Sequence, residues 1–99
     1  MRQGFTYILA SQRNGTLYIG VTNGLYKRVL AHRTGTGSSF TKRYGVHMLV
    51  WHEYYDDIRF AIQRETSLKR WPRKWKLDLI EANNPDWRDL FDELDPHEW

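Results

Sequence analysis

Residues Tyr7–Gly20 read YILASQRNGTLYIG, and this stretch decides the fold of the 99-residue chain because two strand-like runs flank an Asn-Gly pair. Asparagine and glycine tolerate the positive φ angles of tight turns, so the stretch predicts a β-hairpin with strands near residues 5–11 and 16–22. A loop of two or of four residues pairs odd positions of one strand with even positions of the other. One face then holds apolar residues and is predicted to meet the core: Ile8, Ala10, Leu17, Ile19 and Val21.

The other face of the hairpin is less apolar and carries two tyrosines, Tyr7 and Tyr18. It also holds Leu9, Ser11, Gly20 and Thr22. Because Gly20 has no side chain, it leaves room for another group to approach the backbone beside the phenols. A cross-strand aromatic pair that only stiffens the sheet would give the same pattern.

Beyond the hairpin, Asn23-Gly24 ends the second strand and helix and strand signals alternate. We expect a helix over Leu25–Arg33, a polar loop over Gly35–Tyr44 and a third strand over Val46–Tyr55, where β-branched and aromatic residues are frequent.

Asp56 and Asp57 are candidate N-caps for a helix over residues 58–71, and Pro72 suits the first turn of another helix that ends near Ala82. A last helical turn after Asp86 would hold Trp87, Leu90 and Phe91 against the body. The order ββαβαα predicts an α/β domain over residues 1–82 with a small, largely antiparallel sheet. An acidic segment, residues 83–99, packs on this domain or trails from it.

Composition excludes several classes of protein. The chain has no cysteine, which rules out disulfides, thiolate metal sites and thiol catalysis. No apolar run approaches the roughly 20 residues of a membrane span, and the first residues show no signal-peptide core. We therefore expect a cytoplasmic protein that does not enter membranes.

Charge is distributed unevenly along the chain. The formal net charge is +3, but residues 1–77 carry 14 basic and four acidic side chains, whereas residues 78–99 carry one arginine and eight acids. A body this basic suits a polyanion such as nucleic acid, and a merely solvated surface is the alternative.

The first predicted helix places two polar side chains on its inward stripe. Arg28 and His32 are four residues apart and share a face with Leu25 and Val29. A guanidinium there presents a planar, permanently charged fork that suits a phosphate. His32 could donate to the same anion, act as an acid or base, or simply end the helix.

Glu65 lies on the apolar stripe of the second predicted helix, with Ile58, Ala61, Ile62 and Leu68. A carboxylate at such a position needs a cation or hydrogen-bond donors. An ion pair with Arg64, Arg70 or Arg28 would satisfy it, and so would a hard divalent cation that takes its other ligands from phosphate and water. Two phenols, a guanidinium, an imidazole and one carboxylate are together the groups that phosphodiester cleavage requires.

The ordered motifs resemble those of the GIY-YIG nuclease superfamily, and in particular its small stand-alone bacterial members. Phe5-Thr6-Tyr7 and, ten residues later, Tyr18-Ile19-Gly20 are similar to its two tyrosine motifs, although the first reads Phe-Thr-Tyr in place of Gly-Ile-Tyr. VTNGLYKRVLAH (residues 21–32) and AIQRETSLKRW (residues 61–71) resemble its arginine and glutamate helices, and residues 84–90 resemble its C-terminal segment.

That resemblance implies a three-stranded antiparallel sheet flanked by helices, one Mg²⁺ or Mn²⁺ ion, and an endonuclease that hydrolyses phosphodiester bonds in DNA, for example in repair or recombination. Tyr7 and Tyr18 would match the paired tyrosines, one as general base and the other as positioning donor. Arg28 would bind phosphate, Glu65 would bind the metal and His32 would assist. Asn84 is a candidate for the assisting asparagine of some members.

Two basic and aromatic clusters suit a nucleic acid, either structured or single-stranded. Lys42, Arg43 and Tyr44 follow the Gly-Thr-Gly stretch, where they could grip phosphate and stack on a base. Lys69 and Arg70 begin a second cluster that also holds Trp71, Arg73, Lys74, Trp75 and Lys76. The alternative places the tryptophans in the core and makes the lysines solubilising.

Two other functions fit the same residues. A non-catalytic nucleic-acid-binding module of this fold would bind DNA or RNA without metal and would keep binding after Glu65→Ala. An adaptor would engage a protein partner through the acidic segment and exposed tryptophans, and would lose function when residues 83–99 are removed.

Overall fold

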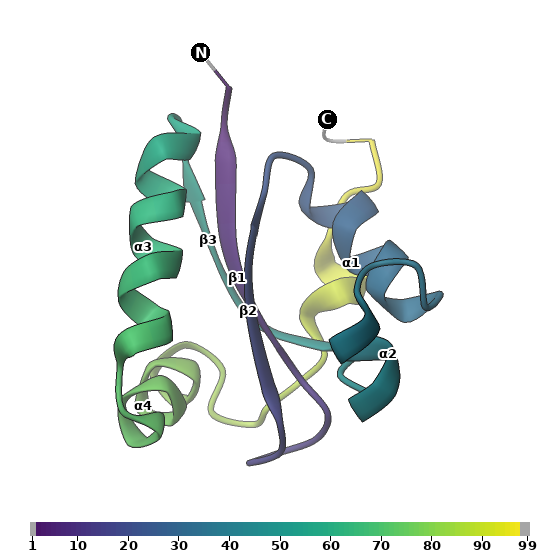
Figure 1. Cartoon of the computed structure of the whole chain (residues 1–99), viewed down its shortest axis with the longest axis vertical. Helices are drawn as coiled ribbons and strands as arrows, with labels where there is room; N and C mark the ends of the chain where they lie inside the picture. Colours follow the sequence, from purple (N-terminus) through teal and green to yellow (C-terminus); the bar gives the residue numbers. More distant parts are fainter. Residues whose placement is uncertain (1, 98–99) are drawn as a thin grey trace.

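A computed structural model of the chain describes residues 2–97. The elements are β1 (Gly4–Ala10), β2 (Leu17–Thr22), α1 (Leu25–Arg33), α2 (Ser39–Tyr44), β3 (Met48–Tyr55), α3 (Ile58–Arg70), α4 (Arg73–Asn83) and a 3-10 turn, η1 (Leu90–Glu93). The strands form one antiparallel sheet in the order β2-β1-β3. Helices α3 and α4 cover one face, and α1, α2 and the C-terminal segment cover the other (Figure 1). The predicted α/β class and three-stranded sheet are confirmed.

The β1–β2 hairpin has the longer of the two predicted loops. Ala10 pairs with Leu17 and Ile8 with Ile19, which leaves residues 12–15 as the loop proper. The Gly15 N–H donates to the Gln12 carbonyl at 2.9 Å, and Asn14 takes a positive φ of 58°. Asn14 of the Asn-Gly pair therefore supplies the left-handed backbone that the turn requires.

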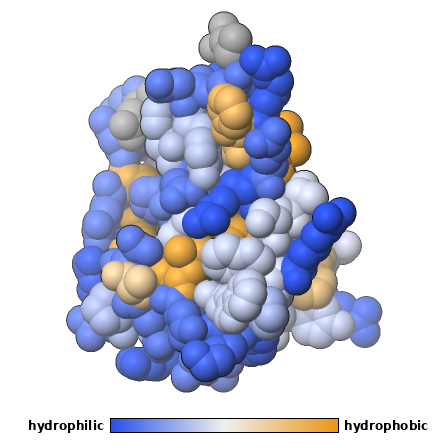
Figure 2. Space-filling model, turned by 90° about the vertical axis from the view of Figure 1, so that its left-hand side faces the viewer, coloured by the Kyte–Doolittle hydropathy of each residue, from blue (hydrophilic) through white to orange (hydrophobic). Residues whose placement is uncertain are grey.

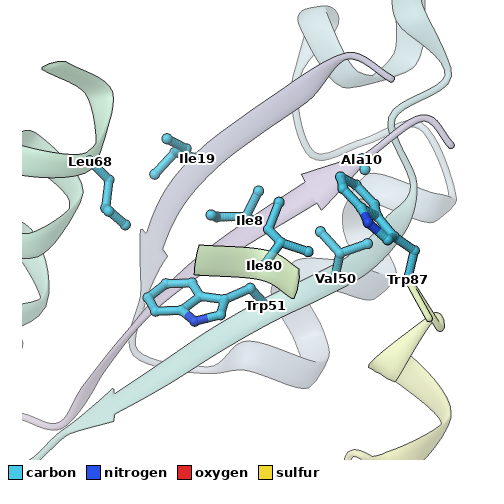
Figure 3. Close-up of a cluster of buried hydrophobic side chains, with 8 residues drawn as sticks. All are labelled: Ile8, Ala10, Ile19, Val50, Trp51, Leu68, Ile80 and Trp87. Carbon is cyan, nitrogen blue, oxygen red and sulfur yellow. The ribbon is translucent and has the colours of Figure 1, made fainter. Parts of the chain in front are cut away.

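The predicted core face of the hairpin packs under α3 and α4. Ile8, Ala10 and Ile19 contact Leu68 of α3 and Ile80 of α4, and Figure 3 shows this cluster completed by Val50, Trp51 and Trp87. The Thr6 hydroxyl also donates to the Ala61 carbonyl at 2.7 Å, which ties β1 to the middle of α3. This packing fixes the position of α3, and therefore of Glu65, along the direction of the strands.

The less apolar tyrosine face of the hairpin is also covered, by α1, α2 and the C-terminal segment. Tyr7 is 1% exposed and belongs to a second cluster with Leu9, Leu25 and Val29, against which Leu90, Phe91 and Leu94 pack. The segments that cover this face lie later in the chain. Both tyrosines thus stand in a layer between sheet and helix rather than on an open sheet.

Helix α2 replaces the polar loop predicted over Gly35–Tyr44. The Ser38 side chain caps it by accepting the Thr41 N–H at 3.1 Å, and Gly45 ends it in the left-handed conformation, with φ 64°. Serine before a short run and glycine after it are helix boundary signals. They remained ambiguous within a stretch rich in glycine, serine and threonine.

Helices α3 and α4 begin where their caps predict, and their ends fall within one residue of expectation. Asp57 caps α3 by accepting the Arg59 N–H at 3.0 Å, and Pro72 precedes the first residue of α4. Ile62, predicted for the inward stripe, is exposed instead. The face presented by α3 is largely hydrophilic, with small apolar patches (Figure 2).

The C-terminal segment folds back on the body and contacts the start of β3. The Asp89 carboxylate accepts the Leu49 N–H at 3.2 Å and pairs with Arg33 of α1, while Phe91 stacks on Tyr26. The segment therefore occupies the edge of β3 at Leu49, and β2 forms the other edge of the sheet. Within residues 2–97, no helix is long and apolar enough to cross a membrane.

Candidate active site

Gly20 lies under the ring of Tyr7. The two residues are partners in the β1–β2 register, and a Cβ built on Gly20 would lie 2.5 Å from both Cζ and Oη of Tyr7. The tyrosine ring therefore crosses the β2 backbone at the one position that has no side chain. The space predicted beside Gly20 is filled by Tyr7 itself, which brings its hydroxyl toward the open edge of the sheet.

His32 meets the Tyr7 hydroxyl from α1. Its Nε2 lies 2.9 Å from Tyr7 Oη, its Nδ1 lies 3.0 Å from Thr41 Oγ1, and the side chain is fully buried. Burial, together with the positive charge of Arg28 and with His47, lowers the pKa of His32 to about 4. The imidazole is therefore neutral at neutral pH.

Arg28, on the inward stripe of α1, acts on both phenols. Its guanidinium interacts with the hydroxyls of Tyr7 and Tyr18, and Nη2 donates to the Gly37 carbonyl at 3.0 Å. Burial alone would lower the pKa of Arg28, but the two tyrosine interactions outweigh it and hold the pKa above its ordinary value. One arginine thus binds two tyrosines and the segment before α2.

Tyr7 is a neutral phenol in the resting protein. Burial raises its pKa to about 12; Arg28 acts in the opposite direction, and Tyr18 and Glu65 add to the rise. An ordinary tyrosine already titrates near pH 10, so the Tyr7 phenolate does not form spontaneously at neutral pH. Any role as a base requires that Tyr7 pass its own proton on as it accepts another.

Tyr18 forms the boundary between the buried groups and solvent. Its ring makes an edge contact with His32 at 5.1 Å and lies 6.4 Å from the ring of Tyr7. Tyr18 also lines an open groove of ≈ 360 Å³ over β2, whose other walls are Leu17, Ile19, Phe40, Lys69 and Lys76. The groove joins the α1–α2 side of the sheet to the α3–α4 side.

Glu65 reaches this region from the opposite face of the sheet. Its charge acts on the Tyr7 hydroxyl, and its Oε2 lies 3.4 Å from Nζ of Lys69, one of the groove residues. The side chain is 19% exposed, and Arg64, one of the partners considered for it, pairs with Glu53 instead. Glu65 therefore acts on Tyr7 electrostatically from the other face of the sheet, and its ion pair is with Lys69.

The donor set fits only one kind of metal. Among the described residues, no three side chains of histidine, cysteine, aspartate or glutamate converge as a metal cage would require. A single, partly exposed carboxylate paired with a mobile lysine suits a hard cation such as Mg²⁺, which keeps several waters and shares phosphate oxygens. A transition metal that needs nitrogen or sulfur ligands does not fit.

Asn84 lies at the C-cap of α4, and its amide is fully used by the backbone. Nδ2 donates to the Val50 and Arg88 carbonyls at 3.2 and 2.8 Å, and Oδ1 accepts the Arg88 N–H at 3.0 Å. The side chain is 2% exposed. These contacts hold the C-terminal segment against β3 and give Asn84 a structural role.

We expect Asn84→Ala to lower the free energy of unfolding by about 1–3 kcal/mol, because it leaves buried backbone groups unpaired. Cleavage at a temperature where the variant is folded should stay within about twofold of wild type. Chemical denaturation and a nuclease assay measure the two effects, with Asn83→Ala on the exposed side of α4 as the control. Loss of cleavage in a folded Asn84→Ala protein would restore the catalytic assignment.

The buried, neutral state of His32 predicts how stability depends on pH. Its folded pKa lies below the ordinary value of 6.5, so the unfolded chain binds a proton that the folded chain does not. Stability should therefore be complete above about pH 6.5 and should fall, by up to about 3 kcal/mol, as pH decreases toward 4.

Urea denaturation of wild type, His32→Asn and His97→Asn between pH 4 and 7 measures this dependence. The His32→Asn protein is less stable at pH 7 but should show a flatter decline, whereas variation at the exposed His97 should leave the curve unchanged. Parallel curves for all three proteins would exclude His32 as the titrating group.

The predicted nucleic-acid contacts divide into two sets. Lys42, Arg43 and Tyr44 are exposed on α2, and the guanidinium of Arg43 lies 5.5 Å from the centre of the Tyr44 ring. Phe40, which the sequence did not single out, continues this set: its ring lies 4.8 Å from Tyr44 and 6.1 Å from Tyr18. An aromatic row, Tyr18, Phe40 and Tyr44, thus leads away from the groove.

The second set lies where α3 meets α4. Lys69 lines the groove and Arg70 is exposed beside it. Trp71 is half-buried against the core, whereas Trp75 is 55% exposed and contacts Trp71 edge to face at 5.8 Å. The alternative prediction, in which both tryptophans belong to the core, is therefore wrong for Trp75.

The fold and these side chains define a class of small α/β domain in which a hairpin tyrosine pair and an arginine helix lie on one face of the sheet and a glutamate helix lies on the other. The family model described as the GIY-YIG catalytic domain matches residues 3–78. The chain belongs to the GIY-YIG family.

Relatives of similar size carry names that state no activity. The UPF0213 protein CPE1444 of Clostridium perfringens is 38% identical over 80 residues, which cover 81% of this chain and 85% of that one. The UPF0213 protein XAC3202 of Xanthomonas axonopodis pv. citri is 44% identical over 71 residues, 71% and 69% of the two chains. A solution NMR structure of the UPF0213 protein BH0048 from Bacillus halodurans matches with a TM-score of 0.56 and 24% identity over 88% of this chain and 92% of that one, which confirms the fold.

Proposed function

We propose that this protein is a metal-dependent endonuclease that hydrolyses phosphodiester bonds in DNA. The observation that carries the proposal is the position of Arg28, whose guanidinium interacts with the hydroxyls of both Tyr7 and Tyr18 beside a buried, neutral His32. A permanent cation held by two phenols next to a proton acceptor is suited to binding a phosphate and activating water there.

The side chains suggest an order for the proton movements. A water beside the Tyr7 hydroxyl gives a proton to the Tyr7 oxygen while the Tyr7 proton moves to Nε2 of His32, 2.9 Å away. This transfer avoids a free Tyr7 phenolate, which burial disfavours. Tyr18 positions the water or phosphate from the groove side, and Arg28 offsets the negative charge that develops on the phosphate.

Glu65 is the residue that would hold the metal, Mg²⁺ or Mn²⁺. Such an ion stabilises the negative charge on the phosphate and on the leaving oxygen when it is bound. Lys69 contacts the same carboxylate at 3.4 Å, so it must move aside when a cation binds there. Its exposed ammonium then remains available to a phosphate at the groove wall.

Unpaired DNA fits the groove better than an intact duplex. The exposed rings of Phe40 and Tyr44 continue the row from Tyr18, and lysines 69 and 76 line the groove. Aromatic rings beside a basic track bind single strands because every base has a face to stack. We expect single-stranded or branched DNA to be cut faster than linear duplex.

The alternative functions have less support. A non-catalytic binding module would not require a buried Tyr7–His32 pair or a half-buried carboxylate beside Lys69, each of which costs free energy to desolvate. An adaptor that uses the acidic segment would need that segment free, yet Trp87 is buried and Asp89 pairs with Arg33.

The proposal is tested by incubating plasmid, single-stranded and branched DNA with the protein in Mg²⁺, in Mn²⁺ and in EDTA. Cleavage should require the metal, and Glu65→Gln should slow it by about 10- to 100-fold, since phosphate and water still supply most ligands of such an ion. Asp78→Asn is the matched control because Asp78 also pairs with a lysine one helical turn away, but that lysine, Lys74, does not line the groove.

Equal cleavage by wild type and Glu65→Gln would reject the assigned metal ligand. Binding to DNA that weakens with salt, in a wild-type protein that cuts none of the substrates, would favour the binding module. Fluorescence anisotropy on the same oligonucleotides separates these outcomes.

A further inference from the structure

A second layer of polar groups lies behind His32, on the side away from Tyr7. Thr41, on the first turns of α2, is fully buried, and its Oγ1 lies 3.0 Å from His32 Nδ1. The same hydroxyl donates to the Ser38 carbonyl at 3.2 Å and lies 3.1 Å from the Ser38 hydroxyl. These contacts join the imidazole to the start of α2.

The hydrogen positions follow from counting donors. A threonine hydroxyl has one hydrogen, and when it points to the Ser38 carbonyl, Thr41 Oγ1 can only accept from His32. Nδ1 then carries the imidazole hydrogen, and Nε2 presents its lone pair to Tyr7. The contacts of Tyr7 lead to the same assignment. Arg28, the other hydrogen-bonding neighbour of the Tyr7 hydroxyl, has donors only, so the Tyr7 hydrogen points to Nε2 of His32.

We propose that Thr41 is a positioning residue whose hydroxyl, held by Ser38, fixes His32 in the Nδ1–H form, so that Nε2 is free to accept the Tyr7 proton during cleavage. The inference rests on the proposed nuclease function. As the water oxygen bonds to phosphorus, its proton goes to Tyr7 and the Tyr7 proton goes to Nε2. The bond to the leaving oxygen breaks, that oxygen takes a proton from solvent, and His32 later returns its extra proton to solvent through Tyr7.

The backbone next to Thr41 also binds Arg28. The Gly37 carbonyl accepts from Arg28 Nη2 at 3.0 Å, and a Cβ on Gly37 would lie 2.5 Å from His32 Nδ1. Residues 37–41 therefore press against the imidazole and bind the two polar side chains on the inward stripe of α1, Arg28 and His32. Helix α2 and its cap set the orientation of Arg28 and His32 together.

Thr41→Val tests the inference, because valine has the shape of threonine without the hydroxyl, and Thr41→Ser is the conservative control. Nitrogen-15 NMR of the imidazole ring reports which nitrogen carries the hydrogen. We expect Nδ1–H in wild type and in Thr41→Ser, and a shift toward Nε2–H in Thr41→Val. Ser38→Ala should keep the wild-type form, since it retains the Ser38 carbonyl.

Cleavage rates are measured on the same proteins over a range of pH, with thermal unfolding as a check of folding. Thr41→Val should cleave about 10- to 100-fold more slowly, the range typical of an outer partner that orients a histidine, with DNA binding within about twofold. Thr41→Ser should regain most of the rate.

Three results would overturn the inference. The first is a hydrogen on Nε2 in wild type, which needs no variant to detect. The second is a folded Thr41→Val protein that cuts at the wild-type rate. The third is a wild-type protein with the expected Nδ1–H form that cuts no DNA with either metal, and this result would reject the proposed function as well.

Discussion

Arg28→Lys is expected to reduce DNA cleavage by about 100- to 1000-fold, although the positive charge is retained. The guanidinium interacts with both tyrosine hydroxyls and with the Gly37 carbonyl, and a lysine ammonium cannot reproduce that planar set of donors. The variant should also loosen residues 37–41, because Gly37 loses its side-chain partner.

Single-turnover cleavage of a single-stranded oligonucleotide in Mg²⁺ measures the effect. Arg13→Lys, at the exposed tip of the hairpin, is the matched control and should cleave as wild type does. An Arg28→Lys protein that keeps more than about a tenth of the rate would show that charge alone is needed, and the two-phenol contact would lose its catalytic meaning.

Gly20→Ala is expected to damage both stability and activity, despite adding a single methyl group. The new Cβ would lie 2.5 Å from the Tyr7 ring and hydroxyl, too close for any real contact, so the ring must shift. Overpacking of this kind costs about 1–3 kcal/mol, and displacement of a reactive group by about 1 Å lowers a rate by roughly 100-fold.

Gly24→Ala is the control, because its added Cβ meets no atom within 4 Å and its backbone is extended. Urea denaturation and the cleavage assay should both distinguish the two alanine variants. In a Tyr7→Leu background the Gly20→Ala penalty should shrink, since a shorter side chain leaves room. A full penalty in that background would mean that β2 itself, and not the ring, resists the methyl group.

Much of this site could be predicted because its residues follow simple periodicities. Strand alternation placed Tyr7 and Tyr18 together, and helical spacing placed Arg28 and His32 on the inward stripe of α1. The carboxylate of Glu65 stood out among apolar neighbours for the same reason. These patterns are local, so one chain segment is enough to reveal each of them.

The parts that sequence did not reveal depend on contacts between distant segments. Thr41 and Phe40 lie in a stretch whose polar composition concealed a six-residue helix, and nothing local shows that Thr41 meets an imidazole. The family resemblance suggested a catalytic role for Asn84, yet its side-chain amide donates to Val50 of β3, which lies 34 positions away in the sequence. The role of Gly20 became clear only when the ring of its cross-strand partner was seen above it.

Tyr7 and His32 are as fully buried as the leucines of the core. Their burial affects the choice of variants used to test for loss of activity. Alanine at either position would leave a hole, so a silent assay could report collapse rather than lost chemistry. Tyr7→Phe removes one oxygen and nothing else, and it is the cleaner probe. The same reasoning applies to evolution: a descendant that replaces either side chain with a smaller one must refill the space beneath helix α1.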